Sequence, residues 1–294
     1  MKVISTINFK GGVGKTTVTW LLAKHAAEQD GKKVLVVDAD AQMSLTLAVG
    51  LDEEKGSYVP RFGEWYRKKH KQRGRTLLDA IYRYYEYASG NAPHFNFPIN
   101  DNFIYQVTPD LHFIPSTEDL YWLELQLQLF KPEHVKSFIQ ALLGKIEHSK
   151  FDYDVVFFDC PPSFTALSYS VLSNCSLILI PVNPDVFAAT GLQIMISGLK
   201  ERIQPWPEPK IAVFMNKARL YRDRLTQESD SFLKAVRQTA ENLTEQGTEV
   251  YLCKTYIPDR AAIRKAMNFG RFPQEFRPCF NDLWCEVKSI LNLP

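Results

Sequence analysis

One stretch near the start of this 294-residue chain decides its fold: Lys10-Gly11-Gly12-Val13-Gly14-Lys15-Thr16-Thr17. It follows a short run rich in β-branched residues, Val3–Phe9, and opens an amphipathic segment, Thr16–Gln29. A glycine-rich loop between a strand and a helix is the setting of a phosphate-binding loop, because backbone N–H groups and the helix N-terminus converge on phosphate oxygens. In such a loop Lys15 is expected to reach the β and γ phosphates, and Thr16 to offer its hydroxyl to Mg²⁺.

The rest of the chain alternates short apolar runs with helix-length amphipathic segments. The runs have the composition of buried parallel strands: Val3–Phe9, Val34–Val37, Leu111–Ile114, Val155–Phe158, Leu177–Val182, Ile211–Met215 and Val250–Leu252. This alternation predicts an α/β fold with a doubly wound, mostly parallel sheet flanked by helices, as in P-loop nucleotide hydrolases. We expect a single domain, residues 1–294, with a polar and basic surface insertion at about 52–106 that contains a helix at Leu77–Tyr87.

Composition excludes several other classes of protein. Hydrophobic residues make up 45% of the chain and charged residues 23%, which is typical of globular domains. The five cysteines have no C-x-x-C spacing, so neither a disulfide framework nor a structural zinc site is expected. No run approaches the roughly 18 apolar residues of a membrane span, and the N-terminus does not resemble a secretory signal. We therefore expect a cytoplasmic protein.

Acidic residues follow two of the predicted strands, at the edge where α/β sheets place their ligands. Asp38 and Asp40 follow Val34–Val37, and Asp159 follows Val155–Phe158. Asp159 is the expected Mg²⁺ ligand, acting through a water molecule. A carboxylate near the γ phosphate can orient a water for in-line attack, so these residues favour nucleotide hydrolysis over binding alone.

The phosphate-binding loop departs from the general pattern at its start, where Phe9 replaces the first glycine and a second lysine, Lys10, follows. Two lysines that flank one tight turn repel each other unless an anion lies between them or one points away. From the residues alone, Lys10 is either a solvated bystander or a ligand for a phosphate bound by another subunit.

Together these residues resemble the deviant Walker-A ATPases of the ParA/MinD group, over nearly the whole chain. The group's hallmark, K-G-G-x-G-K-[ST], is satisfied by residues 10–16. The resemblance implies that Lys10 reaches across an ATP-sandwich homodimer to the partner's nucleotide. It also implies that Asp40, supported by Asp38, positions the attacking water. Ala41 and Ser44 depart from the proline and asparagine that are usual in this segment.

The resemblance extends to the second half of the chain. Residues 159–163 are similar to the group's Walker B motif and second switch, and residues 255–270 to the segment near the adenine, which implies Pro258 and Asp259 as nucleotide ligands. Asn216 looks like the base-reading asparagine of many members, although a turn-forming asparagine would have the same setting. ATP and Mg²⁺ are the implied cofactors, and a weak basal ATPase activity is expected.

Other members of the superfamily fit the sequence less well. A membrane-associated MinD-like ATPase is the main alternative, but the amphipathic end of the chain, Asp282–Pro294, carries two acids against Lys288 and should dock on the protein rather than on anionic lipid. An iron–sulfur reductase needs paired cysteines, and none precedes Cys160. The tyrosines at 82–87 do not support a tyrosine kinase or a ligase, because they have the spacing of an amphipathic helix.

The ParA type remains, whose members bind DNA non-specifically as ATP-bound dimers and release it when a ParB-class adaptor stimulates hydrolysis. The net charge of +2 hides an uneven distribution, because residues 210–271 carry twelve Lys and Arg against seven Asp and Glu. The group's DNA contacts lie in this half, so the candidates are Arg219, Arg222, Arg260, Arg264 and Lys265. We expect such a protein to associate with the nucleoid in its ATP-bound state and to partition or position a plasmid, a chromosome or a carboxysome-like assembly.

A second basic block, residues 61–75, carries seven Lys and Arg against one Glu and contains Trp65 and Tyr66. These residues suit either a solvated loop or a surface for stacking and partner binding.

Overall fold

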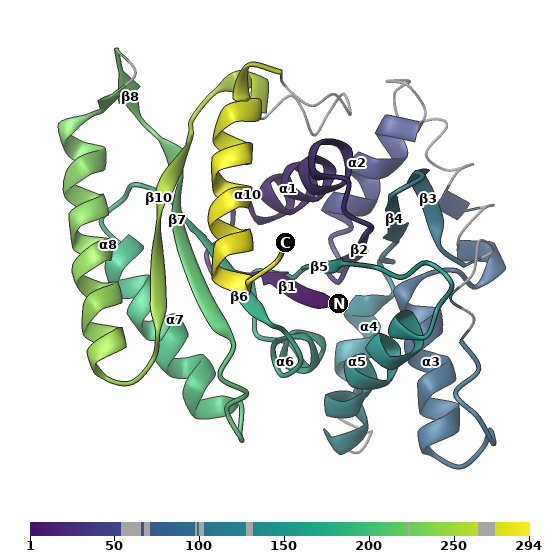
Figure 1. Ribbon diagram of the computed structural model, residues 1–294. Helices are drawn as coiled ribbons and strands as arrows, with labels where there is room; N and C mark the ends of the chain where they lie inside the picture. The colour runs from purple at the N-terminus through teal and green to yellow at the C-terminus, as the bar shows by residue number, and fades with distance from the viewer. Residues whose placement is uncertain are drawn as a thin grey trace.

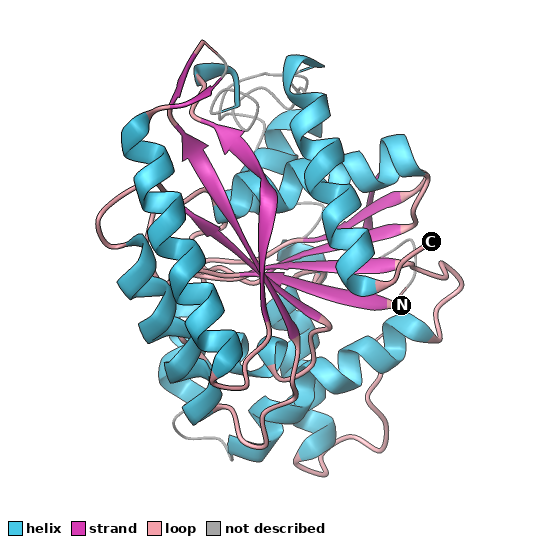
Figure 2. Cartoon of the chain, turned by 60° about the vertical axis from the view of Figure 1, so that its left-hand side comes forward, coloured by secondary structure: helices cyan, strands magenta, loops and turns pink. Residues whose placement is uncertain are grey.

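The protein is described by a computed structural model at residues 1–53, 66–67, 71–97, 99, 103–127, 132–222, 224–263 and 274–294. Two of the proposed DNA contacts, Arg264 and Lys265, lie outside these described residues, as does most of the basic block 61–75. A twisted sheet runs through the middle of the molecule with helices on both faces (Figures 1 and 2).

Among the described residues, the sheet has eight strands in the order β10-β7-β6-β1-β5-β2-β4-β3. All neighbouring pairs are parallel except β3 and β4. The bounds are β1 Lys2–Thr6, β2 Val34–Asp38, β3 Tyr105–Thr108, β4 Leu111–Ile114, β5 Val155–Asp159, β6 Leu177–Val182, β7 Lys210–Ala218 and β10 Val250–Pro258. The predicted doubly wound, mostly parallel sheet is confirmed. The antiparallel edge strand β3 was not predicted, because its four residues are partly exposed and carry no apolar run.

Helices cover the two faces of the sheet and bury separate cores. On one face lie α1 (Lys15–Asp30), α2 (Ser44–Glu53) and α10 (Arg277–Leu291). The opposite face is covered by α3 (Leu77–Ala88), α4 (Leu120–Leu127), α5 (Pro132–Glu147), α6 (Ala166–Leu172), α7 (Ala188–Arg202) and α8 (Gln227–Glu245). Strand β5 supplies both cores, since Val155 and Phe157 belong to one and Val156 and Phe158 to the other. Burial on both faces explains why the strands are continuous apolar runs.

The predicted insertion at about 52–106 contributes to the fold through α3 and the start of β3. Helix α3 buries Leu77, Ile81, Tyr84 and other residues in the core, and β3 begins at Tyr105 and completes the sheet. The tyrosines of α3 behave as an amphipathic helix predicts, because Tyr84 and Tyr85 are buried while Tyr82 and Tyr87 are exposed. The division into one domain with an insertion stays a prediction.

The end of the chain is docked on the protein, as expected. Helix α10 buries Leu283, Trp284 and Val287 in the core that it shares with α1. Asp30 at the end of α1 accepts hydrogen bonds from Trp284 Nε1 at 3.0 Å and from Lys288 Nζ at 2.9 Å. Over the part of the chain that the structure describes, no helix combines the length and apolar character needed to cross a bilayer.

Candidate nucleotide-binding site

The glycine-rich loop connects β1 to α1 at the carboxyl edge of the sheet. Gly12 and Gly14 have φ angles of 73° and 89°, in the left-handed region that glycine adopts without strain. Val13 between them is buried and anchors the loop. The loop borders a cavity of about 690 Å³ whose lining includes Gly11, Gly12, Gly14, Lys15, Thr16, Thr17, Asp40, Gln42, Pro162 and Lys217. Since α1 begins at Lys15, its N-terminus opens onto this cavity, as an anion site requires.

Lys15 is buried at the start of α1, where its ammonium lies within reach of two carboxylates. Its Nζ donates to the Lys10 carbonyl oxygen at 3.4 Å. Burial lowers the pKa of Lys15, while the Asp159 and Asp40 carboxylates favour its charged form. Lys15 therefore lines the cavity as a cation close to the Asp159 and Asp40 carboxylates.

Asp159 ends β5 in a fully buried position. Both of its carboxylate oxygens are buried and have no hydrogen-bond partner among the residues that the structure describes. Burial, reinforced by the neighbouring Asp38 carboxylate, raises the pKa of Asp159 well above its ordinary value. The Thr16 hydroxyl is close enough to favour the charged form, although the two groups form no hydrogen bond. A buried carboxylate with unused oxygens beside a threonine hydroxyl fits a water-coordinated Mg²⁺ ion.

The described residues offer no group of three or more His, Cys, Asp or Glu side chains arranged to hold a metal. A Mg²⁺ ion here would therefore depend on water and on the phosphates of a nucleotide for most of its ligands, which is its usual mode of binding in phosphate sites.

Asp38 and Asp40 occupy different environments. Asp38 is fully buried and accepts hydrogen bonds from Thr46 N at 2.8 Å, Thr46 Oγ1 at 2.6 Å and Asp40 N at 3.1 Å. Burial raises the pKa of Asp38 to about 7. Asp40 lines the cavity, and its carboxylate accepts a hydrogen bond from Gln42 N at 2.9 Å. Asp40 is thus placed to meet a water in the cavity, while Asp38 holds the segment that carries it.

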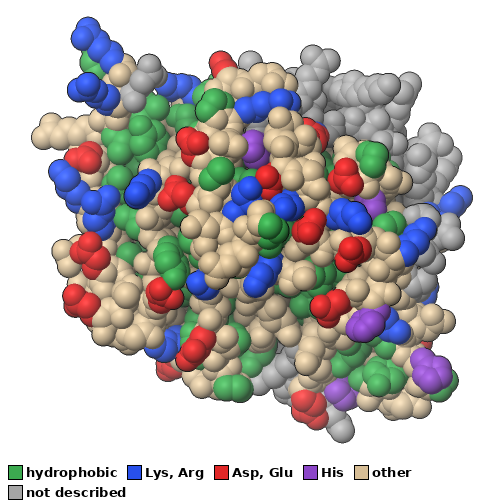
Figure 3. Space-filling model, viewed as in Figure 1, with side chains coloured by type: hydrophobic (Ala, Val, Ile, Leu, Met, Phe, Trp, Pro, Cys, Tyr) green, Lys and Arg blue, Asp and Glu red, His purple; other side chains and the backbone are tan. Residues whose placement is uncertain are grey.

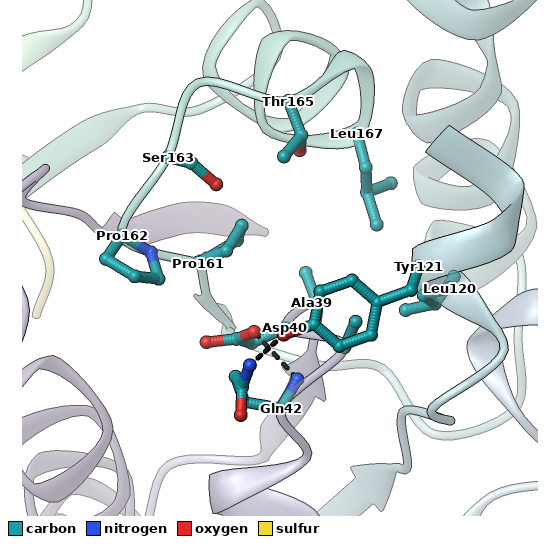
Figure 4. A pocket seen from close by; sticks show the side chains of 11 residues that line it. Ala39, Asp40, Gln42, Leu120, Tyr121, Pro161, Pro162, Ser163, Thr165 and Leu167 are labelled. Atoms are coloured by element: carbon teal, nitrogen blue, oxygen red, sulfur yellow. Dashed lines mark hydrogen bonds between the residues drawn. The ribbon is translucent and has the colours of Figure 1, made fainter. Parts of the chain in front are cut away.

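Residues 116–121 hold this acidic segment from the other side, a role that the sequence did not suggest. Ser116 Oγ donates to the Asp40 carbonyl oxygen at 2.8 Å, and Ser116 N donates to Thr46 Oγ1 at 2.9 Å. The Tyr121 hydroxyl accepts a hydrogen bond from Gln42 Nε2, and its ring points across a smaller cavity of about 140 Å³ toward residues 39–42 (Figure 4). These contacts join residues about 75 positions apart, so no local sequence motif predicts them.

Lys10 forms an ion pair within its own chain. Its Nζ lies 2.6 Å from Asp185 Oδ2 and 5.7 Å from the centroid of the Phe187 ring. Both partners are partly exposed, with 46% of the Lys10 side chain and 30% of the Asp185 side chain accessible. Asp185 follows β6, the parallel neighbour of β1, which explains how two residues distant in sequence meet at one edge of the sheet.

The residues predicted to surround the base lie at the ends of β7 and β10. Asn216 Nδ2 donates to the Val13 carbonyl oxygen at 2.7 Å, so its amide supports the phosphate-binding loop. Pro258 is the register partner of Ala218, and Asp259 N donates to the Ala218 carbonyl oxygen at 2.9 Å. Between Asn216 and Ala218, Lys217 donates from its ammonium to the Gly12 carbonyl oxygen. Lys217 was not among the predicted site residues; its place directly after Asn216 was the available signal.

Comparison with known proteins identifies the family. A family model described as an AAA domain matches residues 1–211. The chain belongs to this family, as a ParA-type P-loop ATPase.

Three similar proteins, two compared by sequence and one by structure, indicate how much of the chain resembles known proteins. The chromosome partitioning protein ParA of Caulobacter vibrioides is 25% identical over 92% of this chain and 85% of its own length. The chromosome-partitioning ATPase Soj of Thermus thermophilus is 26% identical over 94% of this chain and 88% of its own. An ATP complex of a McdA variant from Cyanothece shares the fold, with a TM-score of 0.72 and 20% identity over 100% of this chain and 97% of that one.

In this ParA-type ATPase, the predicted DNA contacts that the structure describes lie on the surface at one end of the sheet. Arg219 and Arg222 flank the first strand of a small hairpin, β8 (Leu220–Tyr221) and β9 (Arg224–Leu225), and Lys and Arg side chains gather over it at the upper left of Figure 3. Arg219 pairs with Glu228 at 2.8 Å, and the Arg222 guanidinium lies 5.3 Å from the centroid of the Tyr221 ring. Arg260 is exposed just beyond β10.

The described part of the basic block 61–75 is packed against the acidic loop that leads into α4. Lys71 Nζ lies 2.6 Å from Glu118 and 2.9 Å from Asp119. The buried Tyr66 donates its hydroxyl hydrogen to Glu118 at 3.1 Å. Tyr66 and Lys71 therefore contact acidic residues of the same chain, unlike residues of a solvated loop, which was one of the two possibilities that the sequence allowed.

Proposed function

We propose that this protein is a partitioning or positioning ATPase that forms an ATP-sandwich dimer, binds DNA without sequence preference, and is released by hydrolysis. The observation that carries the proposal is the convergence of Lys15, Thr16 and Asp40 on one cavity at the N-terminus of α1, with the buried Asp159 carboxylate close enough to Lys15 to favour its charged form. Membership of the ParA-type family supports the same reading.

The residues around the cavity have separate roles in the proposed hydrolysis. The loop N–H groups, the α1 N-terminus and Lys15 bind the phosphate chain, and Thr16 and Asp159 would hold Mg²⁺, the latter through water. Mg²⁺, when bound, neutralises charge that develops on the β and γ phosphates. Asp40 orients a water for in-line attack on the γ phosphorus, which forms a new P–O bond as the bond to the ADP oxygen breaks. Asp38 positions Asp40 through its hydrogen bonds to Thr46 and to the Asp40 backbone.

Dimer formation is supported by apolar side chains beside the cavity. Val186 and Phe187 are 69% and 68% exposed, and Phe9 is 37% exposed next to Lys10. Large apolar side chains gathered at one edge of the sheet commonly mark an interface. In the proposed dimer, Lys10 leaves Asp185 and binds a phosphate of the partner's nucleotide.

DNA binding is proposed to use Arg219, Arg222 and Arg260 together with Arg264 and Lys265. Joining two such surfaces in a dimer raises the number of phosphates neutralised, and with it both the affinity and its dependence on salt. A ParB-class adaptor that stimulates hydrolysis would then release the DNA and move a cargo, for which a plasmid, a chromosome and a carboxysome-like assembly are the candidates.

The test is retention of DNA as a function of nucleotide. We expect the purified protein to retain non-specific duplex DNA with Mg²⁺ and ATP, and to lose it with ADP or without nucleotide. Equal retention in all three conditions would show that ATP does not control DNA binding. The MinD-like alternative predicts instead that the protein sediments with anionic liposomes when ATP is present, and the buried apolar face of α10 argues against this result.

A further inference from the structure

Lys217 lies at the carboxyl end of β7 and belongs to the lining of the nucleotide cavity. Its ammonium donates to the carbonyl oxygen of Gly12 in the phosphate-binding loop. Its φ angle is 54°, in the left-handed region that residues with a Cβ seldom adopt. Such backbone conformations persist where the surrounding structure enforces them, and they cluster at functional sites.

The side chain of Lys217 spans the space between two parts of the site. Its backbone continues β7, whose end lies beside the end of β10, since Ala218 pairs with Pro258. Its ammonium is fixed to the phosphate-binding loop, next to the contact between Asn216 and Val13. The four-carbon stem must therefore cross from the sheet edge to the loop along the wall of the cavity.

The chemistry of this wall suits the base of a nucleotide rather than its phosphates. Phosphates belong at the loop N–H groups and the α1 N-terminus. The base is expected at the ends of β7 and β10, where the residues that the resemblance implies as its neighbours lie, and Lys217 lines the cavity on that side. A lysine with its ammonium held by a carbonyl presents an apolar stem, and such stems pack well against flat apolar surfaces.

We propose that Lys217 is a base-positioning residue, whose stem packs against the purine while Gly12 holds its ammonium in place. The proposal rests on the nucleotide-binding function proposed above. It implies that Lys217 contributes to the binding of ATP and ADP alike, and contributes nothing to the binding of inorganic triphosphate, which has no base.

The experiment compares the dissociation constants of Mg²⁺ complexes of ATP, ADP and inorganic triphosphate by calorimetry. The variants are Lys217→Ala, Lys217→Gly and Lys217→Met, with Lys234→Ala as a matched control, because Lys234 is exposed on α8 and pairs only with Asp230 among the described residues. We expect Lys217→Ala to weaken ATP and ADP by about tenfold, or about 1.4 kcal/mol, and to leave triphosphate unchanged. Lys217→Met keeps a stem and should stay within about threefold of the wild type.

Three results would overturn the proposal. Unchanged ATP affinity in Lys217→Ala would remove the contact with the base. A parallel loss of triphosphate affinity, or a Lys217→Met variant as weak as Lys217→Ala, would show that the ammonium serves the phosphates. Lys217→Gly removes the stem without strain at a positive φ, so it provides the stem-free measurement if Lys217→Ala does not fold. If the wild type binds neither ATP nor ADP, the proposed function itself fails, which is a different outcome.

Discussion

The contact between Gly14 and Asn216 predicts a measurable energetic coupling within the phosphate-binding loop. A Cβ added to Gly14 would collide with Asn216 Nδ2, and Gly14 has a φ of 89°. An alanine in the left-handed region costs about 1–2 kcal/mol. Displacing the Asn216 amide also breaks its buried hydrogen bond to Val13 O, at a cost of about 1–3 kcal/mol. Gly14→Ala should therefore lower the free energy of unfolding by about 2–5 kcal/mol.

The double variant separates these two contributions. Asn216→Ala alone should cost about 1–3 kcal/mol, because it removes the same hydrogen bond. Once the asparagine amide is gone, the methyl group added by Gly14→Ala has no atom to displace and only the backbone strain remains. The double variant should therefore be more stable than the sum of the single effects predicts, by about 1–3 kcal/mol.

Urea unfolding followed by far-ultraviolet circular dichroism measures these free energies, provided that the m-values of the variants agree. Gly11→Ala is the control, since nothing lies within 4 Å of a Cβ at Gly11 and its φ is not positive; we expect a change below about 0.5 kcal/mol. Additive effects of Gly14→Ala and Asn216→Ala would refute the assigned contact and with it the role of Asn216 in supporting the loop.

Four further predictions concern charge in the site. Lys15→Ala should weaken ATP binding by about 10-fold to 100-fold in calorimetry, because it removes charge-assisted hydrogen bonds worth about 1.5–3 kcal/mol. Asp40→Ala should instead bind ATP, fail to release phosphate and remain as a DNA-retaining dimer. Normal turnover in the Asp40→Ala variant would exclude Asp40 from water positioning. Asp185→Asn should raise the ATP-dependent dimer fraction measured by light scattering, because it removes the ion pair that holds Lys10 within its own chain. The increase should be at most about fivefold, since an ion pair this exposed is worth about 1 kcal/mol or less. A decrease would mean that Asp185 belongs to the interface. Burial raises the pKa of Asp38 from 3.8 to about 7, so the folded protein retains a proton there that the unfolded chain releases. The free energy of unfolding should therefore fall as pH rises from about 4 to 7. Asp38→Asn should flatten this slope in urea titrations, and an unchanged slope would contradict the assignment.

Much of the fold and part of the candidate site followed from local patterns. Strands buried on both faces are continuous apolar runs, so their positions were predictable, and the residues just after them had to share one edge of a parallel sheet. The register confirms this geometry, since Asp159 pairs with Thr6 on one side and with Asp38 on the other. The different burial of Asp38 and Asp40 could not be predicted, because it depends on Thr46 and Ser116.

The contacts that escaped prediction link segments far apart in sequence. Tyr121 meets Gln42, Lys217 meets Gly12, and Asp185 meets Lys10, in each case across the loops at the carboxyl edge of the sheet. Single polar residues in loops carry no periodicity, so only the strand order shows which of them become neighbours. Strand β3 was missed for a related reason, because a short edge strand with exposed side chains looks like a loop.

Counting charges along the sequence also does not show which basic residues are already paired with acids of the same chain. Arg219 and Lys71 both belong to basic segments, yet each is already paired with acids of its own chain. No acid among the described residues pairs with Arg222 or Arg224, which are exposed on the β8–β9 hairpin. A paired arginine must give up its partner before it neutralises a phosphate, so it adds less to the affinity for DNA. Arg222→Ala should therefore reduce the salt dependence of DNA binding by about one counterion, whereas Arg219→Ala should reduce it less, and a filter-binding titration across salt concentrations distinguishes the two. Equal slopes for both variants would mean that the Glu228 pair opens on DNA and that the total basic charge of the segment, rather than its unpaired part, determines binding.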